Sequence, residues 1–231
     1  MRDSAQGRPP YRLAFCPRAQ ASPEAVLRGG GDAVFSPREA AELSALPERR
    51  LLDRLAGRLA AKRALRAHFS SEHGWDVEAR DLEIFNDEDG RPVLLLPEGA
   101  PAPAPSFSIA HASEGGVCAV AAHGRRVGAD IETVVPRPAA VIAFVAAAGE
   151  DKDAPPSDPA AQARLWTGKE AALKLLGLGL DADARDVRER GGEVAYEGEP
   201  GRAWRALGAP RVRVDFERAG NSMIAVAYTG E

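Results

Sequence analysis

The segment from Arg49 to Phe69 spaces its leucines at helical intervals, and this periodicity restricts the folds open to the chain more than any other feature. On the other side of the same segment, basic side chains recur every fourth residue, at Arg50, Arg54, Arg58, Lys62 and Arg66. The pattern predicts an amphipathic helix with its leucine face against a core. The ordinary interpretation of its basic stripe is a solvated face. Before it, Ser36 followed by Pro37 is a helix-start signal that predicts a further helix.

Short apolar runs bounded by turn residues predict strands in the rest of the chain. Ile84-Phe85 and residues 93–96 flank a turn containing Asp and Gly, which is typical of a hairpin. Further strand-like runs are residues 107–111, 117–121, 127–132, 212–216 and 223–228, with one more around Val187. Residues 97–105 carry four prolines and predict an exposed connector. Two more helices are predicted, over residues 139–148 and over residues 165–176.

The parts of the chain before and after about residue 124 therefore have similar content, helices together with strands. We expect an α+β fold built from two similar α/β halves, residues 1–124 and residues 125–231. The halves share no residue-level repeat, so the duplication is inferred from the order of the elements alone. The second half carries the acidic residues that point to a function.

Composition limits the partners of the chain. A net charge of −4 gives no support to non-specific binding of nucleic acid or of an anionic membrane, so any affinity for phosphate must be local. The four histidines and two cysteines lack zinc-site spacing, which leaves oxygen ligands for any metal. The first seven residues are not followed by an apolar run, and no segment reaches the ~18 apolar residues of a membrane span. We expect a cytoplasmic protein.

Asp130 and Glu132 form the first candidate site. In a strand over residues 127–132 the side chains alternate, so both carboxylates lie on one face and the apolar residues between them on the other. Two neighbouring carboxylates repel each other unless a cation neutralises them, and an oxygen-only pair suits Mg²⁺ or Mn²⁺. Taken alone, an Asp-x-Glu pair is more often a solvated strand face.

The segment from Trp166 to Lys174 adds a third carboxylate, Glu170. Trp166, Glu170 and Lys174 are successive i, i+4 neighbours on one face of the predicted helix. An ordinary surface ion pair explains the spacing of Glu170 and Lys174 but leaves Trp166 on a polar face. A magnesium-bound diphosphate requires carboxylates for the metal and cations for the remaining phosphate charge, and Lys169 with Lys174 supplies the cations. The residues therefore predict a metal-dependent phosphate site.

Arg91 and His111 are further candidates for this phosphate site. Arg91 lies on the tight turn between Gly90 and Pro92, and His111 ends a strand-like run. The alternative for His111 is a semi-buried structural residue. Walker A, Gly-x-Gly-x-x-Gly and Gly-x-Ser-x-Gly motifs are absent from the sequence, so side chains must grip the phosphates.

Five segments, read in order, resemble the 4′-phosphopantetheinyl transferases of the surfactin-synthetase-activating type. They are residues 56–62, 90–92, 107–111, 128–132 and 166–174. The specific part of the resemblance is the pairing of Gly-x-Asp-Ile-Glu with Trp-x-x-Lys-Glu-Ala-x-x-Lys. The resemblance spans residues 49 to about 180 and implies the pseudo-two-fold fold of that family, in which one chain forms a cleft between its own halves. It therefore also implies a monomer.

The resemblance implies that the chain transfers the phosphopantetheine arm of coenzyme A to a serine of acyl and peptidyl carrier protein domains, releasing adenosine 3′,5′-bisphosphate. Such domains serve fatty acid, polyketide and nonribosomal peptide synthesis. Mg²⁺ would be held by Asp130, Glu132 and Glu170. Glu170 is also the implied base for the carrier serine, directly or through water, and Lys174 neutralises charge on the diphosphate. The positions that match residues lining the coenzyme A phosphates are Arg58, Lys62, Arg91, His111 and Lys169.

Two departures from the family pattern leave alternatives open. Ala110 stands where the family commonly has serine, and residues 141–145 replace the aromatic run often found after the acidic strand. One alternative is a non-catalytic module of the same fold that binds coenzyme A or a carrier protein. Another is a Mg²⁺-dependent phosphohydrolase, which needs only the carboxylates and uses water as the acceptor.

Overall fold

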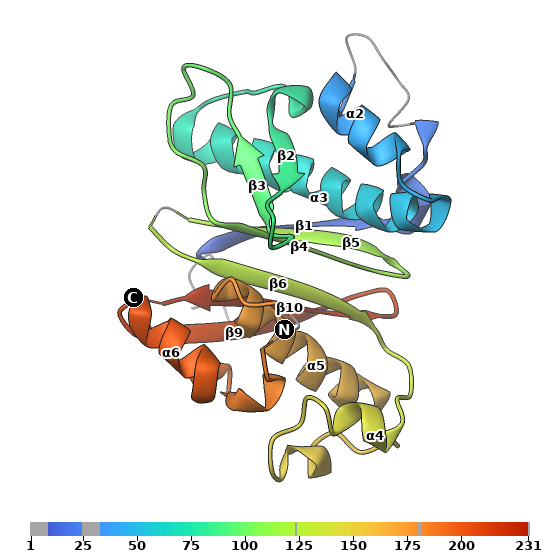
Figure 1. Ribbon diagram of the computed structural model, residues 1–231, viewed down its shortest axis with the longest axis vertical. Coiled ribbons are helices and arrows are strands. Elements are labelled where there is room, and N and C mark those ends of the chain that lie inside the picture. Colours follow the sequence, from blue (N-terminus) through green and yellow to red (C-terminus); the bar gives the residue numbers. More distant parts are fainter. Residues whose placement is uncertain (1–8, 25–32, 123, 180–181, 231) are drawn as a thin grey trace, which may run out of the picture.

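The computed structural model describes residues 9–24, 33–122, 124–179 and 182–230, and the first seven residues of the sequence lie outside them. The architecture is mixed α/β, with two antiparallel sheets stacked between outer helices, as Figure 1 shows. The helices are α2 (Pro37–Ser44), α3 (Glu48–His73), α4 (Ala139–Ile142), α5 (Pro159–Leu175) and α6 (Gly198–Ala206). None of these described helices is long and apolar enough to cross a membrane.

The strands confirm most of the predicted runs. They are β1 (Tyr11–Pro17), β2 (Glu83–Asn86), β3 (Pro92–Leu95), β4 (Phe107–Ala112), β5 (Gly115–Ala121), β6 (Val127–Thr133), β7 (Val187–Arg190), β8 (Glu193–Tyr196), β9 (Val212–Ala219) and β10 (Ser222–Thr229). The first sheet has the order β1-β5-β4 and the second has the order β6-β10-β9-β8-β7. Strands β2 and β3 pair as the predicted hairpin, apart from both sheets.

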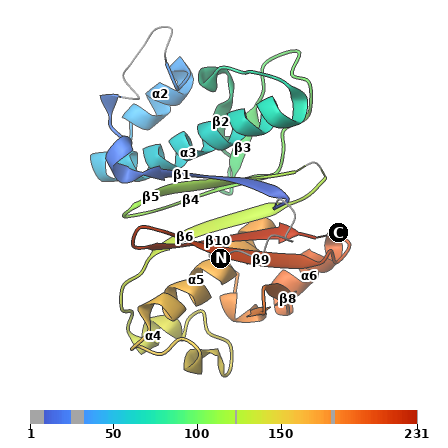
Figure 2. The same ribbon diagram turned by 180° about the vertical axis from the view of Figure 1, so that it is seen from behind.

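Helix α3 lies across the first sheet and is buried along the middle of its length (Figures 1 and 2). Leu55 and Leu65 are fully buried in the core beneath it. A side chain on Gly116 of β5 would overlap the backbone of Gly57 of α3, so helix and strand touch backbone to backbone. The predicted leucine face therefore lies against the core.

The opposite side of α3 is covered as well, by α2 and by the β2–β3 hairpin, whose apolar side chains pack in the same core. Arg58 and Lys62 keep only 3% and 2% of their surface exposed. The solvated-face interpretation of the basic stripe is therefore wrong for these two residues. The helix just before α3 and the hairpin that follows it in the sequence cover that part of α3.

Helix α5 lies across the second sheet, on the face turned away from the first sheet (Figure 2). Gly128 of β6 faces this helix, since a side chain there would overlap the carbonyl oxygen of Ala171. The apolar residues of β6 point the other way, into an apolar layer between the two sheets. The predicted alternation is confirmed, and it places Asp130 and Glu132 on the α5 side of the strand.

Strand β6, at the edge of the second sheet, lies beside β4, at the edge of the first. The backbone N–H groups of Val127 and Ala129 donate to the hydroxyls of Ser106 and Ser108 at 3.2 and 3.0 Å. Serine side chains thus satisfy donors that a strand edge would otherwise leave unpaired. The chain itself crosses from one sheet to the other between β5 and β6.

Four elements differ from the sequence prediction. The helix expected over residues 139–148 is limited to α4, after which the chain turns, Val145 becomes buried and the Ala147 N–H donates to Glu150 Oε2 at 2.8 Å. The sequence prediction contains no element at β1, β8 or α6. Strand β8 has only four residues, and α6 carries glycine and proline in its first turns, so local propensity gives little signal there.

Candidate active site

Asp130 is the more buried of the two carboxylates on β6, with 6% of its surface exposed. Its Oδ1 accepts a 2.6 Å hydrogen bond from Lys174 Nζ of α5. Its Oδ2 is buried and has no hydrogen-bond partner within the described part of the chain. Burial raises the pKa of Asp130, and the Lys174 ammonium opposes that rise. An unpaired oxygen of a buried carboxylate is an acceptor that a cation would satisfy.

Glu170 lies one turn before Lys174 on the same face of α5, with 5% of its surface exposed. Burial raises the pKa of Glu170 to about 7, with a further contribution from Asp130 and opposition from Lys174. Since Asp130 and Lys174 both act on Glu170, the three residues belong to one cluster, although 40 residues separate Asp130 from Glu170 in the sequence. A carboxyl group with this pKa can accept or release a proton near neutral pH.

Glu132 is the third member of the cluster. Burial, followed by the charge of Asp130, raises the pKa of Glu132, whereas Arg137 lowers it. Arg137 Nη2 lies 2.6 Å from Glu132 Oε2, and the guanidinium carbon lies 5.9 Å from the centre of the Trp166 ring. The sequence reasoning missed Arg137. The only indication of a cation here in the sequence was Trp166, an aromatic residue on a polar helix face. The Arg137 guanidinium over its ring explains that position.

The three carboxylates offer only oxygen donors, which is the chemistry that Mg²⁺ and Mn²⁺ prefer. The residues that the structure describes contain no preformed group of three acidic, imidazole or thiol ligands arranged around one point. Two cations instead hold two of the acids, Lys174 at Asp130 and Arg137 at Glu132. The donor set therefore fits a hard divalent cation, and the side chains would have to converge further to bind one.

His111 comes from the first half of the chain, at the end of β4. Partial burial lowers the pKa of His111, and the nearby charges that modify it include Asp53 of α3 on one side and Lys174 and Asp130 on the other. The charges that act on the imidazole therefore come both from α3 and from the acidic cluster. The phosphate contact predicted for His111 stays a prediction.

Arg91 reaches the same region from the β2–β3 turn. A side chain on Gly177, just after α5, would lie 3.6 Å from Arg91 Nε, so this guanidinium lies against the C-terminal end of α5. Its ion pair with Asp89 is exposed and 3.4 Å long. Such a pair contributes little, which leaves Arg91 available to another anion.

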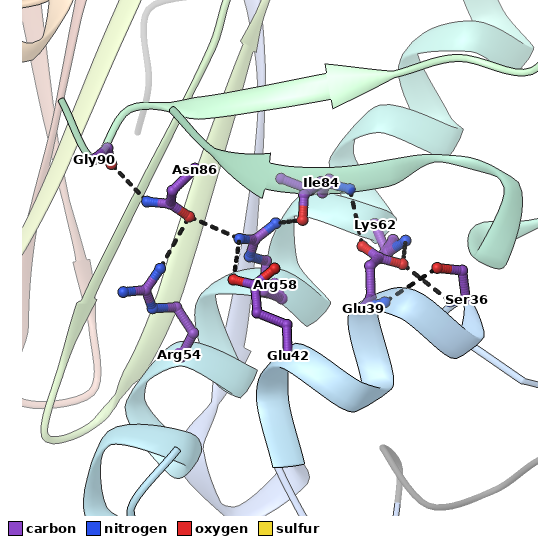
Figure 3. Close-up of polar contacts among 9 residues, drawn as sticks. All are labelled: Ser36, Glu39, Glu42, Arg54, Arg58, Lys62, Ile84, Asn86 and Gly90. Atoms are coloured by element: carbon purple, nitrogen blue, oxygen red, sulfur yellow. Dashed lines mark hydrogen bonds and ion pairs between the residues drawn. The ribbon is translucent and has the colours of Figure 1, made fainter. Parts of the chain in front are cut away.

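Arg58 and Lys62 point into the covering layer over α3, as Figure 3 shows. Arg58 donates to the Ile84 carbonyl and, at 2.7 Å, to Asn86 Oδ1. Lys62 Nζ donates to Glu39 Oε2 at 2.7 Å and to the carbonyls of Ala79 and Leu82 at 2.9 and 2.6 Å. An ammonium has three donors, and those of Lys62 are all used. This arrangement does not support the predicted phosphate contact of Lys62.

Lys169 is likewise turned away from the carboxylates. Its Nζ lies 2.6 Å from Glu150 Oε2 and donates to the carbonyls of Ala184 and Val187 at 3.1 and 2.6 Å. Only 1% of its surface is exposed. One residue along a helix rotates the side chain by about 100°, which separates Lys169 from Glu170. The structure gives Lys169 a packing role between α5 and the chain that follows it.

A family model described as the 4′-phosphopantetheinyl transferase superfamily matches residues 126–209. The holo-[acyl-carrier-protein] synthase of Exiguobacterium sibiricum is 41% identical over 64 residues, which are 28% of this chain and 50% of that protein. The corresponding protein of Geobacillus kaustophilus is 38% identical over 61 residues, 26% of this chain and 47% of that one. The chain thus spans about half the length of the curated relatives it matches.

Among solved structures, the holo-ACP-synthase from Plasmodium yoelii aligns with 46% of this chain and 97% of its own, at 17% identity and a TM-score of 0.38. The holo-[acyl-carrier-protein] synthase from Neisseria meningitidis aligns with 46% of this chain and 98% of its own, at 16% identity and a TM-score of 0.36.

Proposed function

We propose that this chain transfers the 4′-phosphopantetheine arm of coenzyme A to a serine hydroxyl of a carrier protein and releases adenosine 3′,5′-bisphosphate. One observation carries the proposal: the segment that matches the transferase superfamily contains Asp130, Glu132, Glu170 and Lys174, and the fold brings these residues together across β6 and α5. The matching relatives are named holo-[acyl-carrier-protein] synthases, which supports an acyl carrier protein as the acceptor.

In this proposal Asp130 and Glu170 hold a divalent cation, with Glu132 as a third ligand. The acceptor oxygen of Asp130 that lacks a partner among the described residues supports this assignment. When bound, Mg²⁺ or Mn²⁺ would neutralise negative charge on the diphosphate of coenzyme A.

Glu170 is the proposed base. The carrier serine oxygen forms a bond to the β-phosphorus of coenzyme A while the diphosphate bond breaks, and the serine proton passes to Glu170 directly or through a water molecule. In the metal-free protein the pKa of Glu170 is about 7, so near neutral pH this carboxyl can lose its proton and become available to the cation. Lys174, which Asp130 already holds at 2.6 Å, would stabilise the charge that develops on the leaving phosphate.

Arg91 and His111 are the proposed contacts of the first half with the coenzyme A phosphates. Both lie near α5, and neither is saturated by buried protein acceptors. Arg58 is held by the β2–β3 hairpin, close to the turn that carries Arg91, and its contact with a phosphate stays a prediction. The contacts predicted for Lys62 and Lys169 would require both residues to leave their present partners.

We further propose that residues 1–124 and 125–231 are two halves in a pseudo-two-fold arrangement of the surfactin-synthetase-activating type. Each half has one long helix across an antiparallel sheet, and in each a glycine lets the helix touch a strand backbone: Gly116 under α3 and Gly128 under α5. Two such halves supply both walls of a cleft, so a monomer suffices. This type also includes peptidyl carrier domains among its acceptors.

The non-catalytic alternative is weakened by the position of Ala110. This residue is buried in the apolar layer between the two sheets, so the absent hydroxyl does not leave a gap beside the carboxylates. A phosphohydrolase, in contrast, would use the same carboxylates.

The test is to incubate the protein with Mg²⁺ and coenzyme A, with and without an apo acyl carrier protein, and to measure adenosine 3′,5′-bisphosphate by chromatography. The transferase releases this product only when the carrier is present. Release without the carrier, or no release in either sample, would reject the proposal.

A further inference from the structure

Arg137 distinguishes Glu132 from the other two acids of the cluster. Its Nη2 lies 2.6 Å from Glu132 Oε2 and also donates to the Thr133 carbonyl at 3.2 Å. The Arg137 side chain is 12% exposed and that of Glu132 is 31% exposed, so the pair is partly shielded from solvent. Shielded, hydrogen-bonded charge pairs are much stronger than surface pairs.

Residues of helix α5 hold both the backbone and the side chain of Arg137 in place. The Arg137 N–H donates to Gln162 Oε1 at 2.9 Å, and Gln162 Nε2 donates back to the Arg137 carbonyl at 3.2 Å. Gln162 is fully buried. One turn further along α5, the Trp166 ring lies under the guanidinium. Arg137 is therefore a preorganised cation, and little conformational entropy is lost when it binds Glu132.

The other two acids are in a different state. Asp130 has one oxygen on Lys174 and one that no described residue satisfies. No hydrogen bond or ion pair from any described residue reaches the Glu170 carboxylate. Asp130 and Glu132 are thus each held by one cation at 2.6 Å, whereas Glu170 is held by none among the described residues.

We propose that Arg137 competes with the metal for Glu132, so that Glu132 must leave Arg137 before it can join Asp130 and Glu170 around the cation. This inference rests on the proposed metal site. Arg137 acts as a positioning residue that lowers the affinity of the site for divalent cations. The opposite role, in which Arg137 orients Glu132 as a ligand, predicts that loss of Arg137 weakens metal binding.

The test measures Mn²⁺ binding to the metal-free protein by calorimetry, without coenzyme A or carrier protein. Arg137→Gln removes the competing charge and should tighten Mn²⁺ binding by roughly tenfold, since added ligand charge strengthens such sites. The double variant Glu132→Gln/Arg137→Gln replaces a compensated pair by neutral groups and should bind like the wild type. Weaker or unchanged binding by Arg137→Gln, or a double variant much weaker than the wild type, would overturn the proposal.

Arg164 offers a matched control. Its guanidinium carbon lies 3.6 Å from the centre of the Phe216 ring and its Nη2 lies 3.4 Å from Glu189, but it does not touch the acidic cluster. Arg164→Gln should leave Mn²⁺ binding unchanged. If Arg137→Gln does not fold, Arg137→Lys can be tested instead. It keeps the positive charge but lacks the planar guanidinium, so it should bind Mn²⁺ slightly more tightly than the wild type. Weaker Mn²⁺ binding would count against the proposal.

The measurements distinguish failure of the proposed metal site from failure of the proposed competition by Arg137. If Asp130→Asn abolishes Mn²⁺ binding while Arg137→Gln does not change it, the metal site stands and the competition is rejected. If the wild type and Arg137→Gln both bind no Mn²⁺, the metal site itself is rejected and the competition with it.

Discussion

Lys174 Nζ of helix α5 lies 2.6 Å from Asp130 Oδ1 of strand β6. This contact joins the two segments that carry the acidic cluster and places one fixed positive charge beside three carboxylates. The same ammonium opposes the rise in the pKa of each of the three. Lys174 therefore has two effects that can be measured separately: it lowers the pKa of the carboxylates, and it is proposed to act in catalysis.

Lys174→Met should lower the rate of carrier modification by roughly 10²-fold or more, because a preorganised charge at the leaving group contributes on that scale. The substitution keeps most of the side-chain length and apolar packing. Single-turnover kinetics measure the effect. Lys152→Met is the control, since Lys152 is exposed and distant in sequence from the cluster, and it should keep the wild-type rate. Equal rates for both variants would contradict the role given to Lys174.

The rate should depend on pH through Glu170. In the metal-free protein Glu170 must lose its proton before it can bind the cation, so at limiting Mg²⁺ the rate should rise with pH through about 7 and level off above it. Glu170→Gln should be inactive at every pH. A rate profile that is flat between pH 6 and 8, at saturating coenzyme A, would show that Glu170 is not the group that titrates.

The same residue has a signature in stability. In the metal-free folded protein Glu170 keeps its proton up to about pH 7, whereas in the unfolded chain it loses it near pH 4.5. The folded state therefore binds more protons between these values, and stability from this group is lost as pH rises from 4.5 to 7. Glu170→Gln cannot titrate, so its melting temperature should gain on that of the wild type over this range. A constant difference between the two would argue against the raised pKa.

Gly128→Ala should separate helix α5 from strand β6. The added methyl group would overlap the Ala171 carbonyl, so the helix must move, at a cost of about 1–3 kcal/mol, and Glu170 moves with it. Both melting temperature and Mn²⁺ affinity should fall. Gly179→Ala is the control, because its methyl group would meet no atom within 4 Å. Unchanged Mn²⁺ affinity in Gly128→Ala would show that the spacing of helix and strand does not set the metal site.

Replacing Lys62 and replacing Arg91 should have different effects, because Lys62 is a structural cation and Arg91 is a proposed ligand-binding one. Lys62→Met leaves the buried Glu39 uncompensated and should cost about 3–5 kcal/mol in unfolding free energy without changing KM for coenzyme A. Arg91→Ala should raise that KM and leave the melting temperature nearly unchanged, because Arg91 is exposed. A raised KM in a folded Lys62→Met protein would restore the original prediction for Lys62.

The contrast between these residues shows what the sequence can predict. The faces of β6 and α5 follow from periodicities of two and 3.6 residues, so the grouping of Asp130, Glu132 and Glu170 could be predicted without a structure. Whether a basic stripe is solvated depends on what covers it. Lys62 is buried by α2 and by the β2–β3 hairpin. No pattern within the sequence of α3 predicts that these elements pack against it.

Arg137 escaped prediction for a related reason. It lies in the irregular segment after β6, where no periodicity assigns a direction to its side chain. Its partners Gln162 and Trp166 are more than 20 residues away and meet it only because α5 packs across β6. Long-range packing of this kind decides which charged residues become partners.

Intact-mass spectrometry of an apo acyl carrier protein tests the central claim most directly. The carrier is incubated with coenzyme A, Mg²⁺ and either the wild type or Asp130→Asn, which keeps the shape of the buried side chain but removes its charge. The wild type should add the mass of one phosphopantetheine group to each carrier, and Asp130→Asn should add none. A carrier left unmodified by the wild type, or modified equally fast by Asp130→Asn, would contradict the account.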